Sequence, residues 1–311
     1  MSAKVHAGGA HAPGKDPGPG GGVPEALRAL SARIGRDPLQ IQGPGGNTSI
    51  KAGGTLWVKA SGTQLREAQE RDIFVAVDRA RALAELDGTG DGTCRAAMLD
   101  PASPIRPSIE TTLHALFDHP VVLHTHSVAT LAHATSEAGL RHAVAALAAA
   151  GIAAAVVPYA KPGIPLSRAV LEHAGPGADV VLLANHGLLV GARDAAAAEA
   201  LLGAVESALA REPEREPDIA DLWAHPPWRA RAEAGSYWPD HVVFLGPALP
   251  PPGPRKGNGE GNARLMLQCL ADVLARTPSD WTMRPIGPAA EAELMNWDAE
   301  TYRQKLAARD A

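Results

Sequence analysis

The chain has 311 residues, 45% of them hydrophobic and 20% charged, with a net charge of −5, so it can bury a sizeable core. An obligate nucleic-acid binder is disfavoured because its domain would be strongly basic, and no stretch approaches the roughly 18 uninterrupted apolar residues of a membrane-spanning helix. Two cysteines, Cys94 and Cys269, form neither a disulfide framework nor a zinc-knuckle pattern, and no signal peptide is recognisable, so we expect a cytoplasmic protein.

Composition divides the chain into three parts. Residues 1–22 contain seven glycines and three prolines, and we expect a flexible tail because little apolar surface offsets the entropy lost on ordering. Residues 23–211 carry the strongest periodic patterns and are predicted to form the main domain. Residues 212–311 are predicted to be an extension that packs on this domain, with a proline- and glycine-rich loop between Gly246 and Gly261.

Helical and strand patterns alternate along the main domain. In chain order they predict a helix over 24–35, strands over 48–51, 56–59 and 73–77, a helix over 108–119, a strand over 121–125, helices over 127–134 and 140–150, strands over 154–157, 180–184 and 188–190, and a helix over 194–211. The extension is predicted to hold a strand over 241–245 and helices near 262–275 and 289–308. Short strands with flanking helices indicate a layered α/β or α+β fold.

Three histidines stand where predicted strands end. His124 and His126 close an apolar strand, and side chains two apart on a strand point to the same face. His186 lies in Asn-His-Gly, directly after the buried run 180–184. Three such histidines match the ligand pattern of a catalytic zinc, which keeps a fourth position open. The alternative is a set of hydrogen-bonded structural histidines.

A glycine-rich segment, Gly-Pro-Gly-Gly-Asn-Thr-Ser, covers residues 43–49. Its glycines let backbone N–H groups approach a ligand closely, and Asn47 and Thr48 add neutral donors. The segment lacks the lysine of a P-loop and is not a dinucleotide fingerprint. It therefore indicates either an anion-binding turn or a plain tight turn before a strand.

Two further segments, around Lys59 and around Ser108, support an anion-binding site. Lys59 precedes Ser61 and Gly62 in Lys-Ala-Ser-Gly-Thr, which combines a cation, a hydroxyl and a glycine turn. Ser108 is predicted to cap a helix, at the end where an anion is favoured. Together with the glycine-rich segment, these residues predict a site for one phosphate group, although Lys59 also fits a solvated strand position.

Glu110 is the acidic residue nearest to these signals. It is predicted in the first turn of the helix over 108–119, on the same face as His114. A first-turn glutamate commonly only compensates the helix dipole. Placed beside a metal, the same carboxylate would be a natural general base.

The ordered set Gly-Gly-Asn-Thr-Ser, Lys-x-Ser-Gly-Thr, Pro-Ser-x-Glu, His-Thr-His and Asn-His-Gly resembles the class II aldolase/adducin family over about residues 24–211. Segments 56–62, 106–108 and 157–163 are most similar to the aldolase half of the bifunctional rhamnulose-phosphate aldolase/alcohol dehydrogenases. No second glycine fingerprint follows, so we expect no fused dehydrogenase. The resemblance implies a three-layer α/β/α catalytic domain with a central mixed or antiparallel sheet, and a C-terminal helical extension.

The resemblance also implies roles for individual residues. One zinc per chain, or another divalent metal, would be held by His124, His126 and His186, with Glu110 as acid/base and as a further ligand when no substrate is bound. Asn47, Ser61, Gly62 and Ser108 match the phosphate-pocket positions of the family, and Thr48 and Lys59 adjoin them. One hydroxyl donor is missing, because Ile109 stands where the family often has a second serine.

Aldolases of this family take a catalytic tyrosine from a neighbouring subunit, in a segment equivalent to about 140–155. This chain has no tyrosine there, which leaves Tyr159, Tyr237 and Tyr302 as candidates. The resemblance implies a homo-oligomer, most often a tetramer.

The function that the resemblance implies is zinc-dependent cleavage of a phosphorylated ketose to dihydroxyacetone phosphate and an aldehyde. A small-molecule sugar phosphate would be the partner, with neither nucleic acid nor membrane involved. A sugar-phosphate 4-epimerase or a decarboxylase of a 3-oxo-acid phosphate fits the same ligand set. A non-catalytic, adducin-like interaction protein is the third alternative, and it is disfavoured because such members tend to lose metal ligands that this chain keeps.

Overall fold

The computed structural model describes residues 22–88, 92–253 and 260–297. Within them, seven strands form one sheet in the order β3-β2-β1-β4-β7-β6-β5. The strands are β1 (Asn47–Ala52), β2 (Thr55–Lys59), β3 (Phe74–Asp78), β4 (Val121–Thr125), β5 (Ala155–Val157), β6 (Val180–Leu183) and β7 (Gly187–Ala192). Neighbours pair antiparallel, except that β5 and β6 are parallel, so the sheet is mixed as expected.

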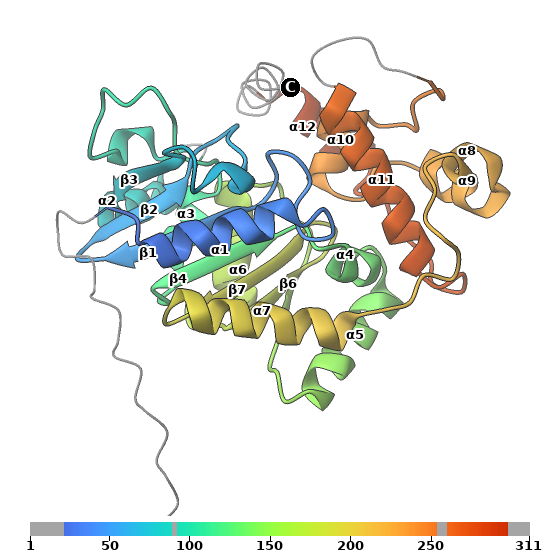
Figure 1. Ribbon diagram of the computed structural model, residues 1–311, viewed down its shortest axis with the longest axis horizontal. Helices are drawn as coiled ribbons and strands as arrows, with labels where there is room; N and C mark the ends of the chain where they lie inside the picture. Colours follow the sequence, from blue (N-terminus) through green and yellow to red (C-terminus); the bar gives the residue numbers. More distant parts are fainter. Residues whose placement is uncertain (1–21, 89–91, 254–259, 298–311) are drawn as a thin grey trace, which may run out of the picture.

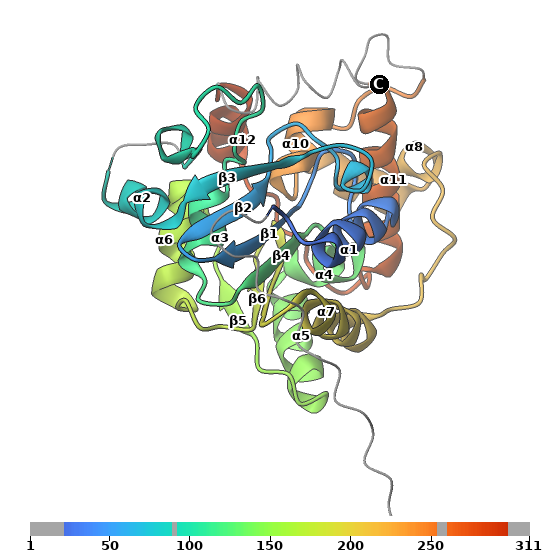
Figure 2. The same cartoon turned by 60° about the vertical axis from the view of Figure 1, so that its left-hand side comes forward.

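Helices cover both faces of this sheet (Figure 2). One face carries α1 (Glu25–Arg36), α5 (Glu137–Ala149) and α7 (Ala195–Leu209), and the other carries α2 (Arg79–Ala84), α3 (Thr111–Leu116) and α6 (Ile164–His173). Strand alternation separates the two cores: Leu123 packs with the first layer, whereas its neighbour Val122 packs with the second. The three-layer α/β/α fold is therefore confirmed.

The C-terminal extension is helical and packs beside α4 (Val128–Ala134), as Figure 1 shows. It contains α8 (Asp221–Ala224), α9 (Pro226–Glu233), α10 (Pro239–Leu245), α11 (Glu260–Arg276) and α12 (Pro288–Met295). Leu131 of α4 shares one buried cluster with Trp238 and with Leu270 of α11. This cluster supports our proposal that residues 212–311 extend the same domain.

Two sequence predictions about local structure are wrong. The strand expected over 241–245 is the helix α10, which begins with Pro239 and has Asp240 in its first turn. Proline at a helix start and an acid in the first turn are both helix signals, and they outweigh the β-branched run that follows.

The helix expected over 108–119 is also shorter than predicted. It runs only from Thr111 to Leu116, and Glu110 occupies the N-cap position before it. The Ser108 hydroxyl does not cap this helix; it accepts a hydrogen bond of 3.2 Å from the Glu110 N–H in the preceding turn.

Four further helices of the structure were not predicted, and some predicted segments fall outside the described residues. The pattern missed α2, α6, α8 and α9. The helix expected over 289–308 is found as α12, which ends at Met295. The rest of that expected helix, from residue 298, lies outside the described residues. The expected tail up to residue 21 and Tyr302 also lie outside them. Across the described segments, no helix is long and apolar enough to cross a bilayer.

Candidate metal centre and pocket

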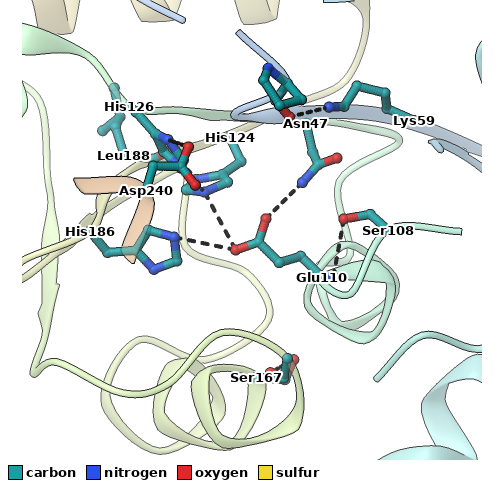
Figure 3. Close-up of polar contacts among 12 residues, drawn as sticks. Asn47, Lys59, Ser108, Glu110, His124, His126, Ser167, His186, Leu188 and Asp240 are labelled. Carbon is teal, nitrogen blue, oxygen red and sulfur yellow. Dashed lines mark hydrogen bonds and ion pairs between the residues drawn. The ribbon is translucent and has the colours of Figure 1, made fainter. Parts of the chain in front are cut away.

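His124, His126 and His186 meet at one end of the sheet (Figure 3). His124 lies at the end of β4, His126 follows that strand, and His186 lies in the turn between β6 and β7. β4 pairs with β7, so this turn comes next to the end of β4. The Nε2 atoms of His124 and His126 are 3.1 Å apart, and one ring nitrogen from each of the three histidines lies within 4.8 Å of the others.

The turn around His186 depends on its two neighbours. Asn185 has a φ of 55°, a left-handed conformation that asparagine tolerates better than most residues. A Cβ on Gly187 would stand only 2.3 Å from the Thr125 carbonyl oxygen, so this position requires glycine. The Asn185 side-chain amide donates to the carbonyls of Tyr237 (2.9 Å) and Arg284 (2.8 Å), which ties the turn to the C-terminal extension.

The surroundings of His124 favour its neutral imidazole. Burial lowers its pKa below the usual value, mainly because the charged form loses its hydration. Its Nδ1 donates to the Leu188 carbonyl at 3.0 Å, which leaves the Nε2 lone pair facing the other histidines.

Glu110 directs one carboxylate oxygen at the histidine cluster. Its Oε1 lies 3.5 Å from His124 Nε2 and 3.3 Å from His186 Nε2, and its Oε2 accepts a 2.7 Å hydrogen bond from the Asn47 amide. Within the described residues, Oε1 is a buried acceptor without a hydrogen-bond donor. A buried carboxylate oxygen in this position fits a cation held by the imidazoles, because an unpaired buried charge is costly.

A small pocket opens beside this cluster. The sequence-predicted residues that line it are Asn47, Lys59, Ser61, Gly62, Ser108, Glu110, His126 and His186. The structure thus brings most of the candidate phosphate residues together with Glu110 and two of the three histidines around one hollow.

His124 belongs to the histidine cluster but does not line the pocket itself. Thr48 is the other predicted site residue outside the lining. It lies on the opposite face of β1 from Asn47, because side chains alternate along a strand. Its hydroxyl is fully buried, 2.7 Å from the Ser31 hydroxyl of α1. Thr48 therefore packs behind the sheet and does not line the pocket.

Lys59 lines the pocket, and its ammonium group also binds backbone carbonyls of the pocket wall. The ammonium donates to the Pro44 carbonyl at 2.8 Å and to the Thr63 carbonyl at 2.9 Å. It is buried, so the alternative of a solvated strand residue is wrong. Lys59 links the glycine-rich loop to the turn after β2.

Neither described tyrosine lines this pocket. The Tyr237 hydroxyl donates to the Arg231 carbonyl at 2.7 Å, and Tyr159 lines a different hollow with Asn185 and Arg284. Burial raises the pKa of both phenols to about 12. Within one chain, these two residues do not take the place of the missing tyrosine.

Sequence reasoning missed two pocket residues, Pro239 and Asp240. Asp240 is buried, and its Oδ2 lies 2.9 Å from His126 Nδ1. The Pro-Asp pair signals a helix start, but nothing in a single sequence shows that this start returns to a strand end more than a hundred residues earlier.

Comparisons with known proteins identify the family to which most of the chain is similar. The sequence profile described as Class II Aldolase and Adducin N-terminal domain matches residues 26–211. A Bacillus subtilis (strain 168) protein named "Uncharacterized oxidoreductase YuxG" is 32% identical over 181 residues, which cover 53% of this chain and 26% of that protein. The chain thus spans about a quarter of that relative.

One solved class II aldolase domain has a similar fold. The N-terminal class II aldolase domain of a conserved protein from Thermoplasma acidophilum is 28% identical, with a TM-score of 0.51, and the match covers 59% of this chain and 90% of that one. An L-fuculose 1-phosphate aldolase is 18% identical, with a TM-score of 0.40 and coverage of 60% and 84%.

Proposed function

Because the chain belongs to the class II aldolase and adducin family, we propose that it is a zinc-dependent cytoplasmic aldolase. It would cleave a phosphorylated ketose reversibly to dihydroxyacetone phosphate and an aldehyde. One observation carries this proposal: the Glu110 Oε1 atom faces the cluster of three histidines, beside a pocket that also presents Ser61 and Ser108.

The donor set supports a divalent metal. Three imidazole nitrogens within 4.8 Å of one another, with a carboxylate oxygen beside two of them, suit the tetrahedral nitrogen and oxygen coordination of zinc. When bound, such an ion supplies a Lewis acid that stabilises the negative charge developing on a substrate oxygen.

Glu110 is proposed to carry the proton at the carbon next to the substrate carbonyl. The hydrogen bond from Asn47 fixes one carboxylate oxygen and leaves the other directed into the site. Because the carboxylate is buried with the histidines, bulk water does not compete for its reacting oxygen.

The rest of the pocket suits a phosphate group. Ser61 and Ser108 supply hydroxyl donors, and Gly62, with a φ of 79°, exposes backbone that a side chain would cover. Lys59 adds a positive charge at the wall. This combination favours a phosphorylated substrate over a neutral sugar.

We also propose that the working form is a homo-oligomer, most simply a tetramer. Neither described tyrosine lines the pocket, and a tyrosine of a neighbouring subunit would supply the proton donor in such an assembly. Light scattering on the active protein tests this, and full activity of a dilute monomer would contradict it.

Glu110→Gln tests the catalytic proposal, because it keeps the size and helix propensity of the side chain while removing the base. We measure solvent deuterium exchange into dihydroxyacetone phosphate by NMR, together with metal content by elemental analysis. We expect about one metal ion per chain in the wild type, and exchange in the variant slower by about 10²–10⁴-fold.

Two further variants make the result specific. Glu199→Gln changes an exposed glutamate on α7 and should exchange at the wild-type rate. His124→Ala should lose both metal and exchange. Wild-type exchange by a Glu110→Gln protein that still binds metal would show that Glu110 is only structural.

A further inference from the structure

The C-terminal extension contributes a side chain to the histidine cluster. Asp240 in the first turn of α10 is 1% exposed, and its Oδ2 lies 2.9 Å from Nδ1 of His126. We infer that Asp240 is a positioning residue that orients His126 for metal binding. This inference rests on the proposed function, since it assumes that the histidine cluster binds a divalent ion.

The two nitrogens of His126 face different partners. Nε2 lies 3.1 Å from Nε2 of His124, inside the cluster, whereas Nδ1 faces the Asp240 carboxylate. The two groups do not have the geometry of a well-aligned hydrogen bond. Their 2.9 Å separation nevertheless places the carboxylate oxygen directly beside the ring nitrogen. A carboxylate on the Nδ1 side favours the tautomer with N–H at Nδ1, which leaves the Nε2 lone pair for a metal.

His124 provides an internal parallel. Its Nδ1 donates to a backbone carbonyl, that of Leu188, and its Nε2 faces the same centre. In two of the three histidines, Nδ1 thus faces an oxygen acceptor on the side away from the cluster. For His124 this acceptor belongs to the sheet, and for His126 it belongs to the C-terminal extension.

The position of Asp240 is fixed by packing. Trp238, two residues earlier, is fully buried against α4 and α11. His241 is also buried, and its Nδ1 accepts a hydrogen bond of 3.3 Å from the Tyr237 N–H. Because buried residues flank it on both sides, the carboxylate is presented by a rigid helix start.

Gly45 provides an independent observation at the same contact. A Cβ on Gly45 would stand 2.7 Å from Asp240 Oδ2 and 3.0 Å from His126 Nδ1. The φ of Gly45 is not positive, so its backbone conformation does not require glycine. The tightest contact that a side chain at position 45 would make is with Asp240, followed by His126 and, at 3.1 Å, the Gln42 carbonyl oxygen.

The test measures metal affinity. Metal-free protein is titrated with Zn²⁺ in competition with a chelating dye, and the Co²⁺ absorption spectrum is recorded. Asp240→Ala should weaken Zn²⁺ binding about 10–100-fold and change the Co²⁺ spectrum. Asp240→Asn, which keeps an amide oxygen beside Nδ1, should recover part of the affinity. The control Asp280→Ala alters an exposed aspartate and should bind as the wild type does.

Gly45→Ala perturbs the same pair without removing either member. We expect weaker Zn²⁺ binding in the wild-type background and a much smaller further effect in the Asp240→Ala background, because contacting residues are not additive. Gly177→Ala is the matched control, since its added Cβ would meet none of the described atoms within 4 Å.

The outcomes separate the two proposals. If the wild type binds no divalent ion at the histidines, the proposed function fails and this inference fails with it. If the wild type binds one ion and the folded Asp240→Ala protein binds it equally tightly, only the role of Asp240 is overturned.

Discussion

Lowering the pH from about 7.5 to about 5 is expected to destabilise the chain through His133, a buried histidine of α4. Its Nδ1 donates to the Ala129 carbonyl at 2.8 Å, and its Nε2 lies 3.2 Å from His142 Nδ1. Both rings contact Trp281 of the C-terminal extension, at centroid distances of 5.3 and 5.5 Å. His133 therefore lies where the extension meets α4 and α5.

The direction and size of this pH effect on the free energy of unfolding follow from the pKa of His133. Burial, with smaller contributions from the charges of His142 and Arg211, lowers the pKa of His133 to about 4. In the unfolded chain the pKa is about 6.5, so between these values the unfolded state binds more protons. The free energy of unfolding therefore keeps its full value, as far as His133 is concerned, above about pH 6.5 and decreases as the pH falls toward 4. The decrease that His133 causes reaches about 2 kcal/mol by about pH 5.

The assay compares the wild type with His133→Phe, which keeps an aromatic ring but removes the titrating group. Urea unfolding of metal-free protein is followed by tryptophan fluorescence over this pH range at one protein concentration. The unfolding free energy of the variant should fall by about 2 kcal/mol less than that of the wild type. His173→Phe, an exposed histidine on α6, should leave the pH dependence unchanged.

Parallel pH curves for the wild type and His133→Phe would refute this reasoning. They would mean that His133 keeps an ordinary pKa in the folded protein. A flatter curve for His173→Phe than for the wild type would likewise show that burial does not decide which histidine makes stability depend on pH.

Three further substitutions test other parts of the structure. Ser61→Asp places a negative charge in the pocket, so the KM of a phosphorylated ketose should rise more than about tenfold, and an unchanged KM in steady-state assays would contradict the phosphate site. Thr48→Val should leave that KM unchanged but lower stability by about 1–3 kcal/mol in urea unfolding, because the buried Ser31 hydroxyl loses its partner. Trp238→Ala should cost about 3–5 kcal/mol in the same assay, and a loss under about 1 kcal/mol would mean that the cluster of α4 and α11 packs loosely.

Local patterns predicted most of the candidate site. The two-residue period of β4 placed His124 and His126 on one face, and Asn-His-Gly placed His186 in a turn. Thr48 was misjudged because the strand begins at Asn47, one residue earlier than predicted, and its alternation turns Thr48 toward α1. Asp240 could not be predicted, because its place beside His126 depends on how the extension packs.

The hydrogen bonds from the Asn185 side chain to the C-terminal extension can form only late in synthesis of the chain. The side-chain amide is held by carbonyls 52 and 99 residues farther along the chain. A ribosome that has made residues 1–211 has delivered Glu110 and all three histidines, yet not the groups that fix the turn carrying His186. A competent site is thus assembled late, after synthesis has passed Arg284, so nascent chains stalled before that point should capture metal poorly.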